Sequence, residues 1–344
     1  MPAFEPIPRT SQARLDASLP DAPLDIATLL AHPPTPTSEK PKTVLYLAYG
    51  SNLCNETFRG ARGIRPLSQT NVVVPSLRLT FDLPGIPYKE PCFANTARRT
   101  LEAQGYHKDA WHKGLVGVVY EVTLSDYAHI IATEGGGSSY ADILVDCHVL
   151  DPKEDTVPTL PTSKPFKAHT LFASQEDNER IVRPDPSYAQ PSARYLKLIT
   201  DGAVECELPG EYQEYLHGIR PFRITSKKQA VGKALFLGIW MPFVLFVFAL
   251  GSKFSDEKGR APGWLAKLSA MVFAGMWTSY DTVFKPTFGE GERTVGDDAL
   301  GEVDPKIWEA LSTRQDAEKE CLLEESVQTM HTNRLAAQRP SLGG

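Results

Sequence analysis

The sequence predicts a small mixed α+β domain whose sheet closes towards a barrel, followed by a C-terminal transmembrane segment. Between residues 43 and 225, many short apolar segments with the alternation of strands are interspersed with a few helical ones. Residues 234–250 carry no charge and consist mainly of Leu, Phe, Val and Ile, a stretch long enough to span a membrane. Residues 1–42 contain nine prolines and little periodic apolar pattern, so they are expected to be a disordered tail with one short helical turn at 24–30.

These changes of composition divide the chain into five expected parts. They are the disordered proline-rich tail (1–42), the globular domain (43–225), a transmembrane helix (231–252), a second span or interfacial helix (264–283) and a polar, acidic tail (289–344). Basic residues gather before the first span, whereas the charges after it are mixed. This bias predicts a membrane protein, single-pass or hairpin, whose globular domain faces the cytosol.

The elements of the domain follow from local pattern. Strands are expected at 44–48, 93–97, 115–122, 143–150 and 167–174, with residues 72–81 as one half-buried strand interrupted near Pro75. Helices are expected at 126–133, 195–204 and 210–218. Ser125 is a suitable N-cap for the first of these helices, and Gly135 is a suitable stop.

Charge and cysteine usage exclude several classes of function. The net charge is −6 and no basic block is present, which argues against nucleic-acid binding. The five cysteines are widely spaced and form no CxxC pair. The pattern therefore favours reduced, mostly buried thiols over a zinc site or a disulfide scaffold.

The first candidate site is the sequence Tyr49-Gly50-Ser51-Asn52-Leu53 at the end of the first apolar strand. A glycine there allows a sharp turn and a close approach of the backbone to a ligand. Consecutive N–H groups in such a turn form a small nest that binds a carboxylate or an oxyanion. A plain strand exit, closed by the Ser and Asn side chains, is the structural alternative.

A second motif, Glu134-Gly135 followed by Tyr140, completes a recognisable combination. Together with the Tyr-Gly-Ser-Asn turn, it resembles the γ-glutamylcyclotransferases. Three further segments agree with this resemblance, namely 114–122, 191–195 and 211–216, and the matching patches span residues 44–222 in the family's order. The triple glycine at 135–137 and the tail after residue 225, with its apolar stretch, depart from the soluble members. The chain therefore resembles a membrane-tethered, fungal-type member of the family.

The resemblance implies a compact barrel-like α+β fold and a lyase-type reaction that requires no cofactor or metal. In that reaction the α-amine of a γ-glutamyl amide attacks its own γ-carbonyl, releasing 5-oxoproline and an amine. Glu134 is the implied acid and base. The implied substrate-binding residues are Tyr49, Gly50, Ser51, Asn52, Leu53, Tyr140 and Tyr195.

The sequence leaves the small-molecule substrate open between γ-glutamyl amino acids and the γ-glutamyl arm of a glutathione conjugate, as in glutathione or secondary metabolism. Two alternatives remain at this point. One is a γ-glutamylamine cyclotransferase, and the other is a non-catalytic, membrane-anchored binding or scaffold protein with the same fold. The presence of Glu134 argues against the second, since a degenerate copy is expected to lose its acid–base residue first.

Overall fold

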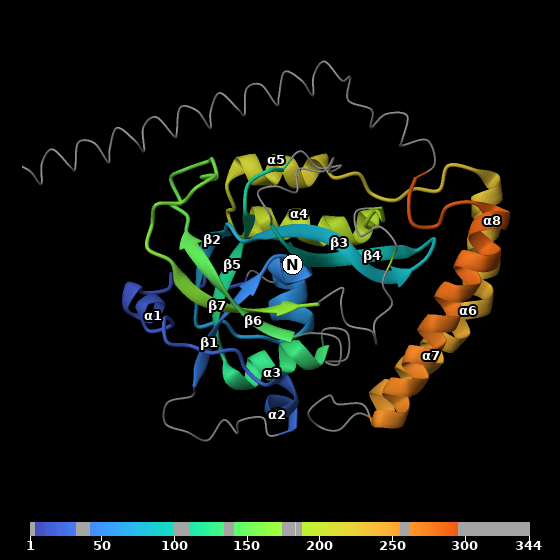
Figure 1. Cartoon of the computed structure of the whole chain (residues 1–344), viewed down its shortest axis with the longest axis horizontal. Helices are drawn as coiled ribbons and strands as arrows, with labels where there is room; N and C mark the ends of the chain where they lie inside the picture. The colour runs from blue at the N-terminus through green and yellow to red at the C-terminus, as the bar shows by residue number, and fades with distance from the viewer. Residues whose placement is uncertain are drawn as a thin grey trace, which may run out of the picture. The chain divides into compact units, whose positions relative to one another are not determined.

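The computed structural model describes residues 4–31, 42–99, 111–133, 141–173, 183, 188–254 and 262–294. Five strands of its main sheet are ordered β1-β5-β2-β6-β7 and close on themselves (Figure 1). They are β1 (Thr43–Ala48), β2 (Ser68–Val74), β5 (Leu115–Thr123), β6 (Ala141–Val149) and β7 (Phe166–Phe172). Neighbouring strands run antiparallel except where β1 meets β7 in parallel at Tyr46 and His169. The predicted mixed α+β class is thus confirmed.

The alternation of side chains along β1 explains how the sheet is covered on both sides. Leu45 and Leu47 are completely buried in one apolar cluster, which also contains Cys147 and Phe166. Tyr46 and Ala48 belong to the other, larger cluster, which includes residues of the helices. Because successive strand residues point to opposite faces, one strand contributes to both cores.

A separate two-stranded ribbon is formed by β3 (Leu77–Ile86) and β4 (Glu90–Arg98). The expected single strand at 72–81 is wrong, because Pro75 follows the end of β2 and β3 pairs with β4 in a different sheet. Proline donates no ladder hydrogen bond, so the chain leaves the barrel there. At the tip of the ribbon, Tyr88 adopts a left-handed backbone conformation with φ 63°.

Three helices belong to this part of the molecule: α3 (Leu124–Thr133), α4 (Ala193–Glu205) and α5 (Gly210–Gly218). Figure 1 shows α4 and α5 along one edge of the strands and α3 along the other. Ser192 caps α4 by accepting a hydrogen bond from the amide of Tyr195. The N-cap of α3 is Thr123, whose hydroxyl accepts a hydrogen bond from the amide of Asp126. The expected cap, Ser125, is wrong because it lies inside the helix.

The N-terminal region differs from the expected disordered tail. Residues 4–31 contain the short helices α1 (Gln12–Asp16) and α2 (Ile26–Ala31) and pack against the barrel. Leu15 is buried, Arg14 forms an ion pair with Glu121 at 2.8 Å, and Arg9 bridges to Gln69 of β2. Prolines are compatible with such an extended arm, because it needs few backbone hydrogen bonds of its own.

The apolar segment after residue 226 forms a helical hairpin. Helix α6 (Lys227–Phe254) is followed by α7 (Gly263–Ser279), a wider helical turn (Tyr280–Phe284) and α8 (Lys285–Phe288). Contacts of Trp240 with Gly275 and of Phe254 with Trp264 show that α6 and α7 pack antiparallel, as the yellow and orange helices of Figure 1 illustrate. Ser226 and Gln229 begin α6 with reciprocal side-chain-to-amide hydrogen bonds, the pattern of a capping box.

Helix α6 is long and apolar enough to cross a membrane. Only 17% of its most apolar window is buried, so most of its hydrophobic surface faces outward. Large exposed side chains follow the outside of the hairpin, among them Leu235, Phe243, Phe246, Phe248 and Met271.

Candidate functional site

The turn predicted as the substrate loop directly follows β1. Ser51–Leu53 form one tight helical turn in which the amide of Leu53 donates to the carbonyl of Gly50 at 3.0 Å. The amide of Leu53 is therefore occupied, and its side chain is completely buried. The turn's own hydrogen bonds leave out the amides of Gly50 and Ser51, as is usual at the start of a helical turn.

The side chain of Asn52 is fixed by a buried hydrogen bond to Tyr46. Its side-chain amide donates to the hydroxyl of Tyr46 at 2.9 Å, and the ring of Tyr46 lies 5.7 Å from that of Tyr127. Tyr127 donates to one carboxylate oxygen of Asp142 at 2.6 Å, while His169 lies 2.8 Å from the other oxygen. Burial, followed by the nearby Asp142 charge, raises the pKa of Tyr127, which therefore remains a neutral donor. This buried polar chain fixes the turn against β1.

Tyr195 is brought to the same turn by α4. Its hydroxyl accepts a hydrogen bond from the amide of Ala94 at 3.1 Å. A methyl group placed on Gly50 would lie 3.4 Å from both the Cβ of Ala94 and the hydroxyl oxygen of Tyr195. Tyr49 directly precedes Gly50, and its hydroxyl donates to the carbonyl of Leu171 at 3.4 Å. The structure thus unites the turn, the ribbon strand β4 and the start of α4.

The C-terminal part of α4 contacts the residues that follow the turn. The sequence analysis did not identify the residues of α4 that make these contacts. Gly202 approaches so closely that a Cβ would lie 2.5 Å from the amide nitrogen of Cys54 and 2.6 Å from the Cβ of Leu53. Glu205 accepts from the amide of Asn55 at 2.7 Å. A glycine inside an otherwise regular helix was the available signal, since it usually has a packing reason.

Glu134 and Tyr140 lie outside the described residues. Helix α3 ends at Thr133 and β6 begins at Ala141, so the described chain brackets both predicted site residues. The guanidinium of Arg62 donates to the hydroxyl of Thr133 at the end of α3.

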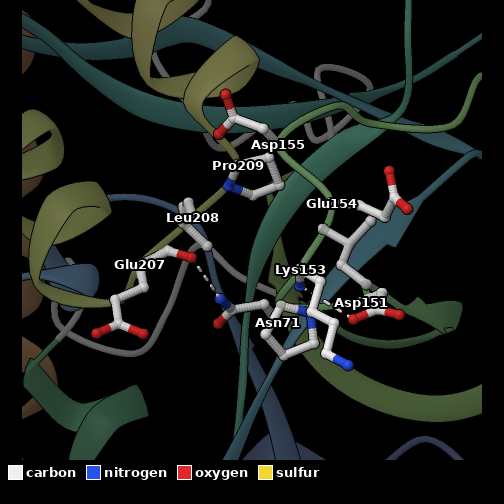
Figure 2. Close-up of a pocket in the computed structure, with 10 residues that line it drawn as sticks. Asn71, Asp151, Lys153, Glu154, Asp155, Glu207, Leu208 and Pro209 are labelled. Carbon is white, nitrogen blue, oxygen red and sulfur yellow. Dashed lines mark hydrogen bonds between the residues drawn. The ribbon is translucent and has the colours of Figure 1, made fainter.

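A polar hollow of about 100 Å³ lies elsewhere on the domain (Figure 2). Asn71 lines it and donates to the carbonyl of Glu207 at 3.1 Å. Its wall also carries Asp151, Glu154 and Asp155, with Lys153 as the single base among its lining residues. Because a γ-glutamyl compound carries carboxylates, this acidic wall is unsuited to it, and none of residues 49–53 lines the hollow.

The described cysteines Cys54, Cys92, Cys147 and Cys206 are buried free thiols. Burial raises the pKa of Cys206 to about 11, so its thiolate is scarce at neutral pH. Within the described ranges, no group of three His, Cys, Asp or Glu side chains is arranged to hold a metal ion.

Comparison with known proteins places these features in a family. The chain is 32% identical to gamma-glutamyl cyclotransferase gliK of Aspergillus fumigatus over 72% of its own length and 89% of that protein. It is 30% identical to gamma-glutamyl cyclotransferase aclK of Aspergillus oryzae, over 74% and 92% of the two chains.

A family profile described as the AclK C-terminal domain matches residues 226–287, which correspond to the helical hairpin. A solved structure titled gamma-glutamyl cyclotransferase aligns with a TM-score of 0.39 and 23% identity over 54% of this chain and 93% of that one, too distant to bear on function. Sequence identity over nearly the full length of curated relatives is decisive: this chain belongs to the gamma-glutamyl cyclotransferase family.

Proposed function

We propose that this chain converts a γ-glutamyl amide into 5-oxoproline and a free amine, with Glu134 as the acid and base. The observation that carries the proposal is the arrangement of the Gly50 turn. The turn follows β1, and a Cβ on Gly50 would lie 3.4 Å from both the Cβ of Ala94 in the ribbon and the hydroxyl of Tyr195 in α4. Family membership supports the same chemistry.

The reaction is an intramolecular aminolysis. The substrate's α-nitrogen, after losing a proton, attacks the γ-carbonyl carbon, so that a new C–N bond closes a five-membered lactam. The bond from that carbon to the amide nitrogen of the leaving group then breaks. The α-nitrogen loses two protons in total, and the departing amine gains two. A single carboxylate that accepts and returns protons therefore ends the cycle unchanged.

This role requires a carboxyl group that takes up and returns a proton near neutral pH. A mostly apolar pocket around the carboxyl group of Glu134 would meet that requirement. Proximity of the two reacting groups is already built into the substrate.

The binding groups follow from the turn. The amides of Gly50 and Ser51 hold the substrate's carboxylate or the oxyanion that develops on the γ-carbonyl. Asn52 and Leu53 act mainly by keeping the turn in shape, because both side chains are buried. The hydroxyls of Tyr49, Tyr140 and Tyr195 complete the pocket as hydrogen-bonding groups.

The substrate class we favour is the γ-glutamyl arm of a bulky, apolar glutathione S-conjugate, of the kind used in secondary metabolism. The exposed apolar surface of the hairpin supports this choice, because a membrane anchor would place the enzyme where such conjugates partition. The hairpin enters the bilayer through residues 231–252, and the catalytic domain faces the cytosol, where Lys227, Lys228 and Lys233 precede the apolar stretch.

The test is release of 5-oxoproline by the full-length protein in detergent micelles. The panel comprises a γ-glutamyl amino acid, glutathione, a γ-glutamyl-lysine isopeptide and an apolar glutathione S-conjugate. Glu134→Gln is compared with Glu214→Gln, a matched change at an exposed glutamate of α5. We expect turnover to fall by about 10³-fold or more in the first variant and to persist in the second.

Release by wild-type protein that survives Glu134→Gln would assign the proton transfers to another group. Preference for the isopeptide would identify a γ-glutamylamine cyclotransferase. No release from any member by folded protein would contradict the proposal and favour a binding module.

A further inference from the structure

The chain returns from the helical hairpin into the catalytic domain. After α8, residues 289–294, here called the return segment, run against the tip of the β3–β4 ribbon. The amide of Tyr88 donates to the carbonyl of Gly291 at 2.7 Å, and its hydroxyl donates to the carbonyl of Gly289 at 2.6 Å. The amide of Gly291 donates in turn to the hydroxyl of Tyr280 at 2.8 Å. These bonds hold the left-handed backbone of Tyr88 and join the ribbon to the hairpin.

A buried ion pair locks the return segment in place. Glu292 is only 1% exposed, and both of its carboxylate oxygens accept hydrogen bonds from the guanidinium of Arg183, at 2.8 and 2.5 Å. The same guanidinium binds Asp281 through two further bonds and stacks 4.3 Å from the ring of Trp277. Through these contacts, Arg183 joins α7, the wider turn and the return segment to one another.

The connection continues from Glu292 to the candidate site through consecutive residues. The amide of Gln190 donates to the carbonyl of Glu292 at 2.8 Å, and its side-chain oxygen accepts from the amide of Thr294 at 2.8 Å. Two residues later, Ser192 caps α4 and donates to Glu90 of the ribbon at 2.7 Å. Tyr195, in the first turn of that helix, faces Gly50.

We propose that Glu292 is a positioning residue for the cyclotransferase reaction, acting through Gln190 and the start of α4 on Tyr195. The helical hairpin then forms part of the frame of the substrate site, in addition to any role as an anchor. This inference rests on the proposed function. Its physical basis is that the ribbon, the α4 cap and the return segment are cross-linked by buried polar contacts, whose loss leaves Tyr195 free to shift.

The expected effect is on substrate binding more than on chemistry. Tyr195 and the Gly50 turn contact the γ-glutamyl arm, whereas proton transfer depends on Glu134. A small displacement of positioning groups costs up to about a hundredfold in efficiency. For Glu292→Ala we therefore expect KM to rise about tenfold while kcat falls by less than about threefold.

The experiment uses the full-length protein in detergent micelles with the best substrate of the panel. Glu292→Ala is compared with Glu292→Gln, which keeps the shape and one acceptor for Arg183, and with Asp201→Ala. The last variant removes an exposed ion pair to Lys197 on the same helix α4. Hydrogen exchange of the peptides that cover residues 188–205 is measured in parallel. We expect faster exchange and a raised KM in Glu292→Ala, smaller changes in the same direction in Glu292→Gln, and no change in Asp201→Ala.

The outcomes separate the two proposals. A wild-type protein that fails to release 5-oxoproline contradicts the proposed function, and hydrogen exchange alone then decides whether Glu292 orders the start of α4. Unchanged exchange in Glu292→Ala overturns the inference. A fall in kcat that matches the loss of folded protein, with KM unchanged, also overturns it, because that is the signature of a merely structural residue.

Discussion

Gly202 is the residue on which the geometry of the turn depends most directly. A methyl group there would collide with the backbone of Leu53 and Cys54, neither of which can move without displacing the turn. We expect Gly202→Ala to lower the free energy of unfolding by about 1–3 kcal/mol. It should also lower 5-oxoproline release more than the loss of folded protein explains. Thermal unfolding and turnover measure the two effects.

The matched control is Gly218→Ala at the end of α5, where an added methyl group meets nothing within 4 Å. If Gly202→Ala behaved like this control, the close approach of α4 to the turn would not matter for activity.

Glu121 links the N-terminal arm to the barrel and predicts a pH dependence. Its carboxylate accepts hydrogen bonds from Arg14, Thr43 and Ser68. Burial alone would raise the pKa of Glu121, but these hydrogen bonds outweigh burial and lower it. A lowered pKa in the folded state stabilises the protein above the usual glutamate pKa, and this contribution is lost as the pH falls through the lowered value.

We therefore expect Glu121→Gln to destabilise the protein by about 1–2 kcal/mol near neutral pH. The difference from wild type should shrink steadily under acidic conditions. Thermal unfolding as a function of pH measures it, with the exposed Glu214→Gln as the control. A difference that stayed constant down to acidic pH would show that the charge of Glu121 contributes little.

At the residue scale, the sequence identified the motif but not its support. Gly50 and Tyr195 are close neighbours, whereas the hydroxyl of Tyr49 donates to the carbonyl of Leu171, and the binding roles of all three residues stay predictions. The amide of Leu53 is not available to a ligand, because it donates to the carbonyl of Gly50 within the turn. Tyr46, Asp142 and His169 were missed, because a buried polar chain has no fixed spacing in sequence.

At the scale of the elements, the helical hairpin depends on small residues. A Cβ on Gly232 would lie 2.4 Å from the Cβ of Phe288, so α6 and α8 meet only because residue 232 is a glycine. Gly232→Leu should separate the two helices and lower the unfolding temperature in micelles. Gly238→Leu, on the same helix with nothing within 4 Å, is the control and should leave that temperature unchanged. Equal behaviour of the two variants would argue against this contact.

The elements were predicted unevenly, for physical reasons. Helix α5 has the expected bounds, and β5 lies centrally in the sheet between β1 and β2, as its continuous apolar run suggests. The N-terminal arm was misjudged because its hold on the barrel consists of single contacts, such as Leu15 and Arg14, without any periodic pattern. A repeated apolar face is visible in a sequence as a period, whereas a contact made by a single residue leaves no pattern.

At the scale of the whole molecule, the helical hairpin packs on the globular domain across the expected boundary at residue 225. Tyr88 is 1% exposed because it is covered by residues of the hairpin, including Phe236 and Tyr280. The return segment, moreover, lies within the stretch expected to be a polar tail. The sequence of residues 289–294 contains no pattern that predicts their hydrogen bonds to the ribbon. These bonds are known only from the three-dimensional structure.

We expect a chain that ends at residue 225 to be less stable and prone to aggregate, since it exposes Tyr88 and removes the acceptor of the Gln190 amide. A chain that ends at residue 295, where the first compact unit ends, should retain wild-type stability. Gel filtration and thermal unfolding of both truncations provide the measurement. A monomeric, fully stable 1–225 chain would restore the simpler boundary.

Helix α6 leads away from the catalytic domain, and α7 with α8 leads back to it, ending at the tip of the ribbon. In the membrane arrangement proposed above, such a hairpin passes any depth of the bilayer twice, and the contact of Phe254 with Trp264 lies at the end of the helix pair opposite α8. The N-terminal arm and the return segment then share one aqueous compartment. Reporters placed at the N-terminus and directly after residue 294 would meet the same pH, proteases and redox buffer.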